Sequence, residues 1–296
     1  MPERDGYIPG VPCWVDASQP DPEAAVAFYS GLFGWKFENV MPAGSEGAYF
    51  IARIRGGDVA AVTAPPQESP HAAMWNTYIS VARADDAAAR ALEAGGEVLV
   101  PPFDVMEAGR TAVLADPEGA IFCVWEARRH RGAQIVNEHG AVNFNGLHTR
   151  DLEAAKRFYG SVFGWETLTL DGGNQMWTLP GYGDELEREA PGRRAQTLAF
   201  GVPAEFMDVV ANISPIPAEE RDVPPHWDVT FGVDDADGIA ERATELGATV
   251  LAGPVDVPWA RMTMISDPQG ATFIANQFVP ENRDIATRSD VPVNAA

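Results

Sequence analysis

The chain carries the same sequence pattern twice, and this duplication constrains its fold more than any other feature. An Asp-x-Glu-Ala-Ala motif followed by Phe-Tyr and Phe-Gly-Trp spans residues 21–35 and recurs at residues 151–165, an offset of 130 residues. An Asp-Pro-x-Gly-Ala motif at residues 116–120 recurs at residues 267–271. Solenoid units repeat every ~20–50 residues, so a repeat of this length indicates a duplicated domain. We therefore expect two related domains that can be compared position by position.

Each copy is expected to contain two modules with the element order β-α-β-β-β, which makes the fold class α+β. In the first module, a strand at 11–17 precedes a helix that Asp21 caps, with Pro22 at the first helical position. In the second module, the alternating strand at 75–81 precedes an Ala-rich helix that ends at Gly95. The second copy has matching elements, with strands at 141–149 and 227–233 and helices that begin at Asp151 and Ala236.

These elements predict an N-terminal domain at residues 10–127 and a C-terminal domain at residues 141–279. Residues 128–140 are expected to form a solvated linker, and residues 280–296 a polar, frayed tail. The second copy is longer between its two modules. The charged, Gly/Pro-rich segment near 180–196 is therefore expected to be an inserted surface loop, either a lid over a pocket or a plain insertion.

The composition favours a globular, cytoplasmic protein. Its 296 residues suit two domains, each able to bury its own core. A formal net charge of −22 argues against nucleic acid and anionic membranes as partners. No apolar run reaches the length of a membrane span. The two cysteines, Cys13 and Cys123, cannot form a disulfide framework. Monomer and homodimer both remain open.

The Asp-capped helix, the Phe-Tyr and Phe-Gly-Trp motifs and the Asp-Pro-x-Gly turn together resemble a vicinal-oxygen-chelate domain. This superfamily contains glyoxalase I, bleomycin-resistance proteins and extradiol dioxygenases. The resemblance covers the chain from Pro12 to Phe278 and is strongest to two-domain actinobacterial members of the glyoxalase-like type. It implies four modules that form open, curved, mixed sheets around cavities. It does not fix the function, because the superfamily includes isomerases, dioxygenases, transferases and non-catalytic drug binders.

The resemblance also implies where a metal would be held, by His, Glu or Gln on the first and last strands of the modules. The implied positions are Trp14, Asn76 and Cys123 in the first copy and Phe144, Asp228 and Ile274 in the second. Only Cys123 and Asp228 are able to bind a metal, and neither has a convincing partner in its own copy. We therefore expect no metal and no other cofactor. The position at the end of each first module is not assigned at this point.

Side chains alternate along a strand, so residues of equal parity share the face that lines each cavity. This predicts two sets of ligand-binding residues: Trp14, Asp16, Asn76, Tyr78 and Cys123 in the first copy, and Phe144, His148, His226, Asp228, Thr230 and Ile274 in the second. The aromatic rings at Trp14 and Phe144 either stack on a flat ligand or fill the space that it would need. His148 and Asp228 are the candidate catalytic pair, because a histidine beside a carboxylate acts as acid or base near neutral pH. The alternative is a structural hydrogen bond.

Three functions remain open. The first is a metal-independent tailoring enzyme that acts on a bulky apolar or aromatic, natural-product-like molecule. The second is a non-catalytic protein that binds a drug or metabolite, for example in self-resistance. The third is a metal-dependent lyase or dioxygenase, which the missing ligands disfavour. Only the second copy has the long insertion and the His148–Asp228 pair, so we expect the working site in the C-terminal half.

Overall fold

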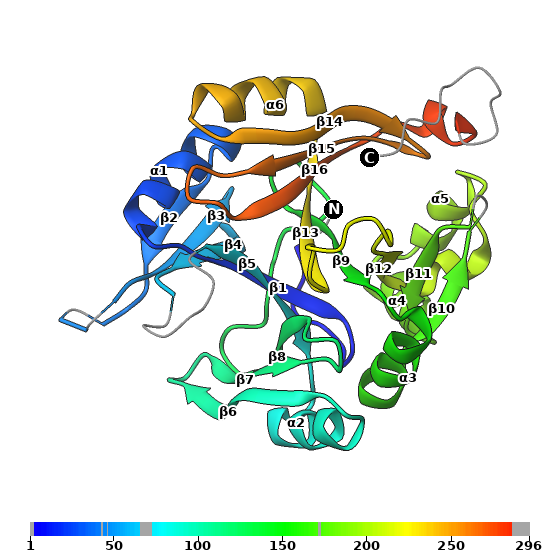
Figure 1. The fold of residues 1–296 in the computed structure, drawn as a ribbon, viewed down its shortest axis with the longest axis horizontal. Helices are drawn as coiled ribbons and strands as arrows, with labels where there is room; N and C mark the ends of the chain where they lie inside the picture. Colours follow the sequence, from blue (N-terminus) through cyan, green and yellow to red (C-terminus); the bar gives the residue numbers. More distant parts are fainter. Residues whose placement is uncertain (1–2, 43, 46, 66–72, 171–172, 286–296) are drawn as a thin grey trace.

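The computed structural model describes residues 3–42, 44–45, 47–65, 73–170 and 173–285, and these form two eight-stranded sheets, one from each half of the chain (Figure 1). The N-terminal sheet has the spatial order β2 (Lys36–Asn39), β3 (Tyr49–Ile54), β4 (Gly57–Thr63), β1 (Pro12–Ser18), β5 (Met74–Ser80), β8 (Ile121–Ala127), β7 (Gly109–Ala115) and β6 (Glu97–Val105). The C-terminal sheet repeats this order with β10 (Glu166–Thr169), β11 (Gln175–Thr178), β12 (Val209–Pro215), β9 (Val142–Thr149), β13 (His226–Val233), β16 (Thr272–Phe278), β15 (Ala260–Ser266) and β14 (Thr249–Val257).

Strand pairing explains how two modules make one sheet. In the N-terminal half, β1 pairs antiparallel with β5 at the centre, and each of these strands pairs in parallel with the last strand of its own module, β4 or β8. In the C-terminal half, β9, β13, β12 and β16 pair in the same way. Both sheets are mixed and open rather than closed barrels, so the expected α+β architecture of four β-α-β-β-β modules is confirmed.

The helices begin and end where the duplicated motifs predict. The first modules contribute α1 (Pro22–Phe33) and α3 (Leu152–Phe163), and the second modules contribute α2 (Ala84–Glu93) and α6 (Ala236–Glu245). The capping aspartate of α1 accepts a hydrogen bond from a backbone N–H at 3.0 Å, and that of α3 accepts one at 2.9 Å. The glycine after each helix has a φ of 71° or 75°, a left-handed conformation that glycine adopts without steric cost.

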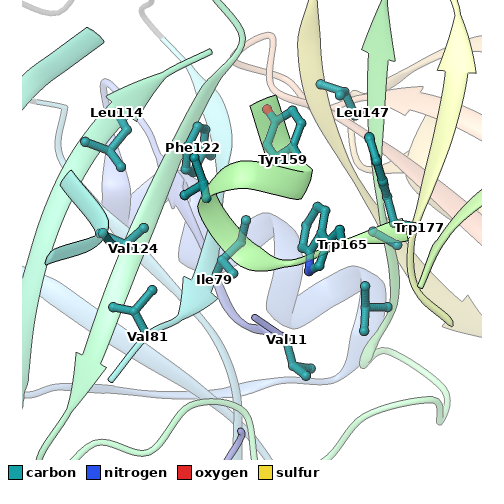
Figure 2. Packing of buried hydrophobic residues seen from close by; sticks show 14 of the residues in the cluster. Val11, Ile79, Val81, Leu114, Phe122, Val124, Leu147, Tyr159, Trp165 and Trp177 are labelled. Atoms are coloured by element: carbon teal, nitrogen blue, oxygen red, sulfur yellow. The ribbon is translucent and has the colours of Figure 1, made fainter. Parts of the chain in front are cut away.

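The two halves share their hydrophobic cores. One core combines β5, β8 and α2 with α3, β11 and β12 of the other half, and Figure 2 shows Ile79 and Phe122 beside Tyr159, Trp165 and Trp177. The other core combines α1 and β4 with α6, β13 and β16. Helices from different halves consequently lie together, α1 beside α6 and α2 beside α3 (Figure 1). The expectation of one separate core per domain is wrong, because the helix-covered faces of the two sheets bury each other.

The duplicated motifs meet across this interface. The hydroxyl of Tyr29, in the Phe-Tyr motif of α1, donates to Asp267 Oδ2 at 2.8 Å in the Asp-Pro-x-Gly turn of the other half. The hydroxyl of Tyr159 donates to Asp116 Oδ2 at 3.2 Å in the reciprocal contact. Each hydroxyl also accepts a hydrogen bond from a buried tryptophan indole of its own half. The Phe-Tyr motif of each half therefore binds the Asp-Pro-x-Gly turn of the other half.

The inserted segment is largely helical, which corrects the expectation of a surface loop. It contains α4 (Tyr182–Glu189), α5 (Arg193–Leu198) and the 3-10 helix η1 (Ala204–Asp208). Tyr182 and Leu186 of α4 are buried in the first shared core. They lie four residues apart, so they share one face of the helix, and this apolar stripe among charged residues gives α4 its packing.

The linker is packed rather than solvated. The backbone N–H groups of Arg128 and His130 both donate to Ala108 O at 3.0 Å, and that of Ala133 donates to Cys13 O at 2.8 Å. Ala133 and Ile135 are buried. The expectation of a solvated linker is therefore wrong, because apolar side chains of the linker are buried and its backbone N–H groups donate to carbonyl groups of the N-terminal half.

The chain continues beyond the last strand as a short 3-10 helix, η2 (Pro280–Asn282). Most of the expected polar tail, residues 286–296, lies outside the described residues. In the described part of the chain, no helix is both long enough and apolar enough to cross a membrane.

Candidate functional site

The inner face of the N-terminal sheet holds an enclosed polar and aromatic cluster. Asp16 is 2% exposed and accepts hydrogen bonds from the Tyr78 hydroxyl at 2.8 Å, the Tyr49 hydroxyl at 3.0 Å and Asn76 Nδ2 at 2.8 Å. Burial raises the pKa of Asp16, although the three donors favour its ionised form. The indole of Trp14, which is also buried, donates to the Tyr49 hydroxyl at 3.0 Å. These polar groups therefore satisfy one another.

The linker encloses this cluster. The ring of His130 meets Trp14 edge-on, with 4.3 Å between ring centroids, and the Trp125 indole donates to the His130 carbonyl at 2.9 Å. Cys123 lies opposite Tyr78, and burial raises the pKa of its thiol. The structure thus brings together the five residues predicted for the first cavity. Trp14, Asp16 and Cys123 are buried, whereas Asn76 and Tyr78 are half-buried, and the role of the five residues in binding stays a prediction.

The inner face of the C-terminal sheet is accessible, and it carries the candidate catalytic pair. His148 Nε2 lies 2.6 Å from Asp228 Oδ2, and the two side chains are 25% and 12% exposed. In the register of β9 and β13, Asp228 is opposite Gly146 and His148 is opposite His226. The predicted pair is therefore in contact at a surface that solvent reaches, whereas its catalytic role stays a prediction.

Gly146 makes the His148–Asp228 contact possible. A Cβ at this position would lie 2.8 Å from Asp228 Oδ1 and 3.0 Å from Oδ2. The equivalent position in the N-terminal half is Asp16, which lies opposite Asn76 as Gly146 lies opposite Asp228. The glycine therefore leaves the space in which the Asp228 carboxylate crosses β9 to reach His148.

His226 stacks on His148. Their rings are parallel within 1°, with 4.6 Å between centroids. Nδ1 of His226 lies 2.8 Å from Pro224 O, and because a carbonyl only accepts, Nδ1 carries the proton and Nε2 holds a lone pair in the neutral ring. Burial lowers the pKa of His226, the charge of His148 adds to this effect, and the Pro224 hydrogen bond and Asp228 oppose it. The ring is therefore neutral at neutral pH.

The other predicted residues line the same face. Thr230 is opposite both Phe144 and Ile274; it is buried, whereas the two apolar side chains are half-buried. Sequence reasoning missed Met262 and Met264 on the neighbouring β15, of which Met264 is opposite Ile274. Their spacing of two residues was a strand signal that would have placed them on this face. The resulting surface is apolar around a polar pair.

Family models match both halves of the chain. Residues 14–124 match the Glyoxalase/Bleomycin resistance protein/Dioxygenase superfamily, and residues 141–275 match a glyoxalase-like domain. The chain belongs to this superfamily. The resemblance carried by the duplicated motifs is thus confirmed.

Relatives in this superfamily align over almost the full chain. "Putative glyoxylase CFP32" of Mycobacterium tuberculosis is 36% identical over 284 residues, which cover 95% of this chain and 100% of that protein. The anthracycline biosynthesis protein DnrV of Streptomyces peucetius is 34% identical over 280 residues, 90% of this chain and 93% of that protein. The Mn(II)-bound glyoxalase from Novosphingobium aromaticivorans has a similar fold at 15% identity, with a TM-score of 0.57, over 91% of this chain and 83% of that chain.

Strand register now assigns the metal position that the sequence left open. In each second module, the two implied metal positions are related by strand register. Cys123 is opposite Tyr78, which lies two residues after Asn76, and Ile274 is opposite Thr230, which lies two residues after Asp228. The same rule in the first modules selects Ala61, opposite Asp16, and Asn212, opposite Gly146. The complete sets are Trp14, Ala61, Asn76 and Cys123 in the N-terminal half and Phe144, Asn212, Asp228 and Ile274 in the C-terminal half.

These side chains do not fit the divalent metal that the superfamily implies. The N-terminal set offers one amide, which donates to Asp16, and one buried thiol whose raised pKa keeps it protonated. The C-terminal set offers one amide and one carboxylate, and that carboxylate already bonds to His148. A divalent cation in a protein site of this kind needs several oxygen or imidazole ligands. Within the described ranges, no group of three or more His, Cys, Asp or Glu side chains is arranged to hold a metal.

Proposed function

We propose that the C-terminal half is a metal-independent acid–base site that moves a proton on a bulky aromatic small molecule. The observation that carries this proposal is the 2.6 Å contact between His148 Nε2 and Asp228 Oδ2 on an accessible inner face. A carboxylate in this position fixes the orientation of the imidazole and stabilises the imidazolium that forms during proton transfer.

The direction of proton transfer follows from the nitrogen that is already engaged. The Nε2–H of His148 donates to Asp228, so Nδ1 of the neutral ring carries the lone pair. Nδ1 forms no hydrogen bond to the described residues. A ligand C–H next to a carbonyl loses its proton to Nδ1, the electron pair remains on the ligand as an enolate, and Asp228 balances the charge of the imidazolium. Return of the proton to the same or another atom gives exchange or isomerisation.

His226 serves as a second proton acceptor beside this pair. Its Nε2 lone pair is not used by the Pro224 hydrogen bond, and burial keeps the ring neutral. A neutral ring stacked on His148 avoids two adjacent cations when His148 is protonated.

The lining and the relatives both support an aromatic ligand. Phe144, Ile274, Met262 and Met264 surround the polar pair with half-buried apolar surface, and methionine adapts to ligands of different shape. DauV of Streptomyces sp. strain C5 and DnrV are named as anthracycline biosynthesis proteins. We therefore propose an anthracycline-type polycyclic molecule as the substrate class and a tailoring step as the role.

Solvent deuterium exchange tests this function without knowledge of the product. Anthracycline-type compounds are incubated with the protein in D2O, and mass spectrometry measures deuterium uptake at carbon. The wild-type protein should catalyse uptake, and His148→Gln should lower the rate by about 10²–10⁴-fold, the usual contribution of a general base. Uptake at equal rates in both proteins would contradict the proposal.

Binding and metal measurements separate the competing functions. A non-catalytic binder would bind the compounds by isothermal titration but show no exchange in the wild-type protein. Treatment with a chelator should leave exchange unchanged, because the site lacks metal ligands. One tightly bound Fe, Mn, Ni or Zn per chain, whose removal stops exchange, would instead establish the metal-dependent alternative.

A further inference from the structure

Three aromatic side chains lie together at one end of the open face. Phe278 ends β16, Trp259 lies in the β14–β15 turn, and Phe200 follows α5 in the insertion. The rings of Trp259 and Phe278 are parallel within 4°, with 6.4 Å between centroids, and the ring of Phe200 meets Phe278 edge-on at 5.3 Å. Three distant segments of the chain thus form one aromatic rim, defined as Phe200, Trp259 and Phe278.

Folding alone does not account for this rim. Phe200 is 44% exposed and Phe278 is 53% exposed, so neither ring is placed there to fill a core. Trp259 has a φ of 69°, and Arg55 and Met106 have φ values of 50° and 46° in other hairpin turns, so this left-handed conformation belongs to the turn. In the N-terminal half, Ala127 takes the place of Phe278, because it pairs with Gly109 as Phe278 pairs with Ala260.

The rim is continuous with the His148–Asp228 pair. Ile274, Asn276 and Phe278 alternate onto the same face of β16, and Ile274 lies opposite Thr230, two residues from Asp228. Four residue steps along β16 and two along β13, at about 3.3 Å each, place the rim about 20 Å from the pair along the strands. The half-buried Met262 and Met264 flank this path on β15, opposite Asn276 and Ile274 respectively.

We propose that the rim binds the flat ring system of an elongated aromatic ligand whose reacting end lies at His148. This inference rests on the proposed function and adds the length and orientation of its substrate. A ligand that reaches from the rim to the His148–Asp228 pair must span about 20 Å along the strands, so it needs an extension in addition to the flat ring system that stacks on the rim. Half-way along β16, Asn276 Nδ2 donates to Asn143 Oδ1 at 2.7 Å, so this side chain joins β16 to β9 beneath the path.

Binding of a fluorescent anthracycline glycoside, followed by fluorescence polarisation, tests the rim. Phe278→Ala and Phe200→Ala should each weaken binding by about tenfold, and Phe278→Tyr, which keeps the ring, should restore it. Phe103→Ala is the matched control, because Phe103 on β6 of the N-terminal half is 45% exposed, and its removal should leave binding unchanged. Thermal melting of each variant verifies that the exposed substitutions leave the fold intact.

The outcomes separate the rim from the acid–base site. Equal affinity of the wild-type protein and both alanine variants would overturn the rim while leaving exchange at His148 intact. Rim-dependent binding without deuterium exchange in the wild-type protein would support the rim and overturn the acid–base function. No binding of the probe to the wild-type protein would overturn the rim, because the proposal places the flat ring system of this class of compound on these side chains.

Discussion

Asn76 and Asp228 occupy equivalent positions in the two halves. Asn76 reaches from β5 to β1 in the N-terminal half, and Asp228 reaches from β13 to β9 in the C-terminal half. Asn76 meets a carboxylate, Asp16, which two tyrosines and the linker enclose. Asp228 passes over Gly146 and meets an ionisable partner, His148, which solvent reaches. The same cross-strand contact is therefore a closed structural network in one half and an accessible acid–base pair in the other. The position of the carboxylate and the packed linker distinguish the Asp16 network from the His148–Asp228 pair that we propose as the acid–base site.

Removal of the Asp16 carboxylate should have the largest effect on stability. In Asp16→Ala the hydroxyls of Tyr49 and Tyr78 and the amide of Asn76 lose their buried acceptor. A buried donor without a partner costs ~1–3 kcal/mol, so the free energy of unfolding should fall by about 3 kcal/mol in urea titrations. Deuterium exchange at the other half should persist in the folded protein.

The matched control for this substitution is Asp5→Ala, because the Asp5 side chain is 98% exposed. It should change the free energy of unfolding by less than about 0.5 kcal/mol. Equal losses in the two variants would mean that the enclosed network contributes nothing to the fold.

Gly146→Ala should disturb the His148–Asp228 pair of the C-terminal half and leave the Asp16 cluster of the N-terminal half unchanged. The new Cβ would lie 2.8 Å from Asp228 Oδ1 and move the carboxylate away from His148. A displacement of about 1 Å in an acid–base site lowers the rate by about 10²-fold, so exchange should fall by that factor with little change in melting temperature. Gly160→Ala, whose Cβ has no neighbour closer than 3.3 Å, is the control and should exchange at the wild-type rate. An unchanged rate in Gly146→Ala would disprove the role of the glycine.

The two reciprocal tyrosine–aspartate hydrogen bonds between the halves should contribute equally to the free energy of unfolding. Tyr29→Phe and Tyr159→Phe each remove a buried hydroxyl that donates to an aspartate of the other half. A hydrogen bond to a charged group contributes ~1.5–3 kcal/mol, so each variant should lose about 1.5 kcal/mol in chemical unfolding. A difference of more than about 1 kcal/mol between the two would contradict the equivalence of the two contacts.

The smallest effect concerns one histidine in each half. Burial lowers the pKa of His130 and the pKa of His226. The charge of Asp58 acts in the opposite sense on His130. The folded protein therefore favours neutral rings, and the unfolded chain binds more protons as the pH falls below about 6.5. Stability should decrease from about pH 7 towards pH 5, and His226→Gln should flatten this slope in melting experiments. An identical slope in the wild-type protein and the variant would show that His226 titrates equally in both states.

The local parts of the structure followed from the sequence. The caps at Asp21 and Asp151 and the period of two along the strands predicted the helices and the shared face of His148 and Asp228, because these patterns act over a few residues. The duplication supplied the internal alignment. The buried face of α4 was missed, because Tyr182 and Leu186 are few among many charges.

Contacts between distant segments could not be predicted in this way. The linker covers Trp14 through His130, and the rim joins three segments that no local pattern connects. The sharing of cores was also invisible, because an apolar helix face does not reveal which sheet will cover it. Sequence periodicity therefore identified the apolar face of each helix and strand, but it did not identify the segment that packs against that face.

The exchange of helices between the two cores has a consequence for how this molecule changes over evolutionary time. A duplicated copy that has lost its chemistry is ordinarily free to degrade. Here α2, β5 and β8 of the N-terminal half form the layer beneath α3 and the strands of the C-terminal half. Loss of the N-terminal half would remove that layer, expose the apolar face of α3 and take away packing against β9, the strand that carries His148. Packing therefore constrains the sequence of the N-terminal half, independently of any role of that half in ligand binding.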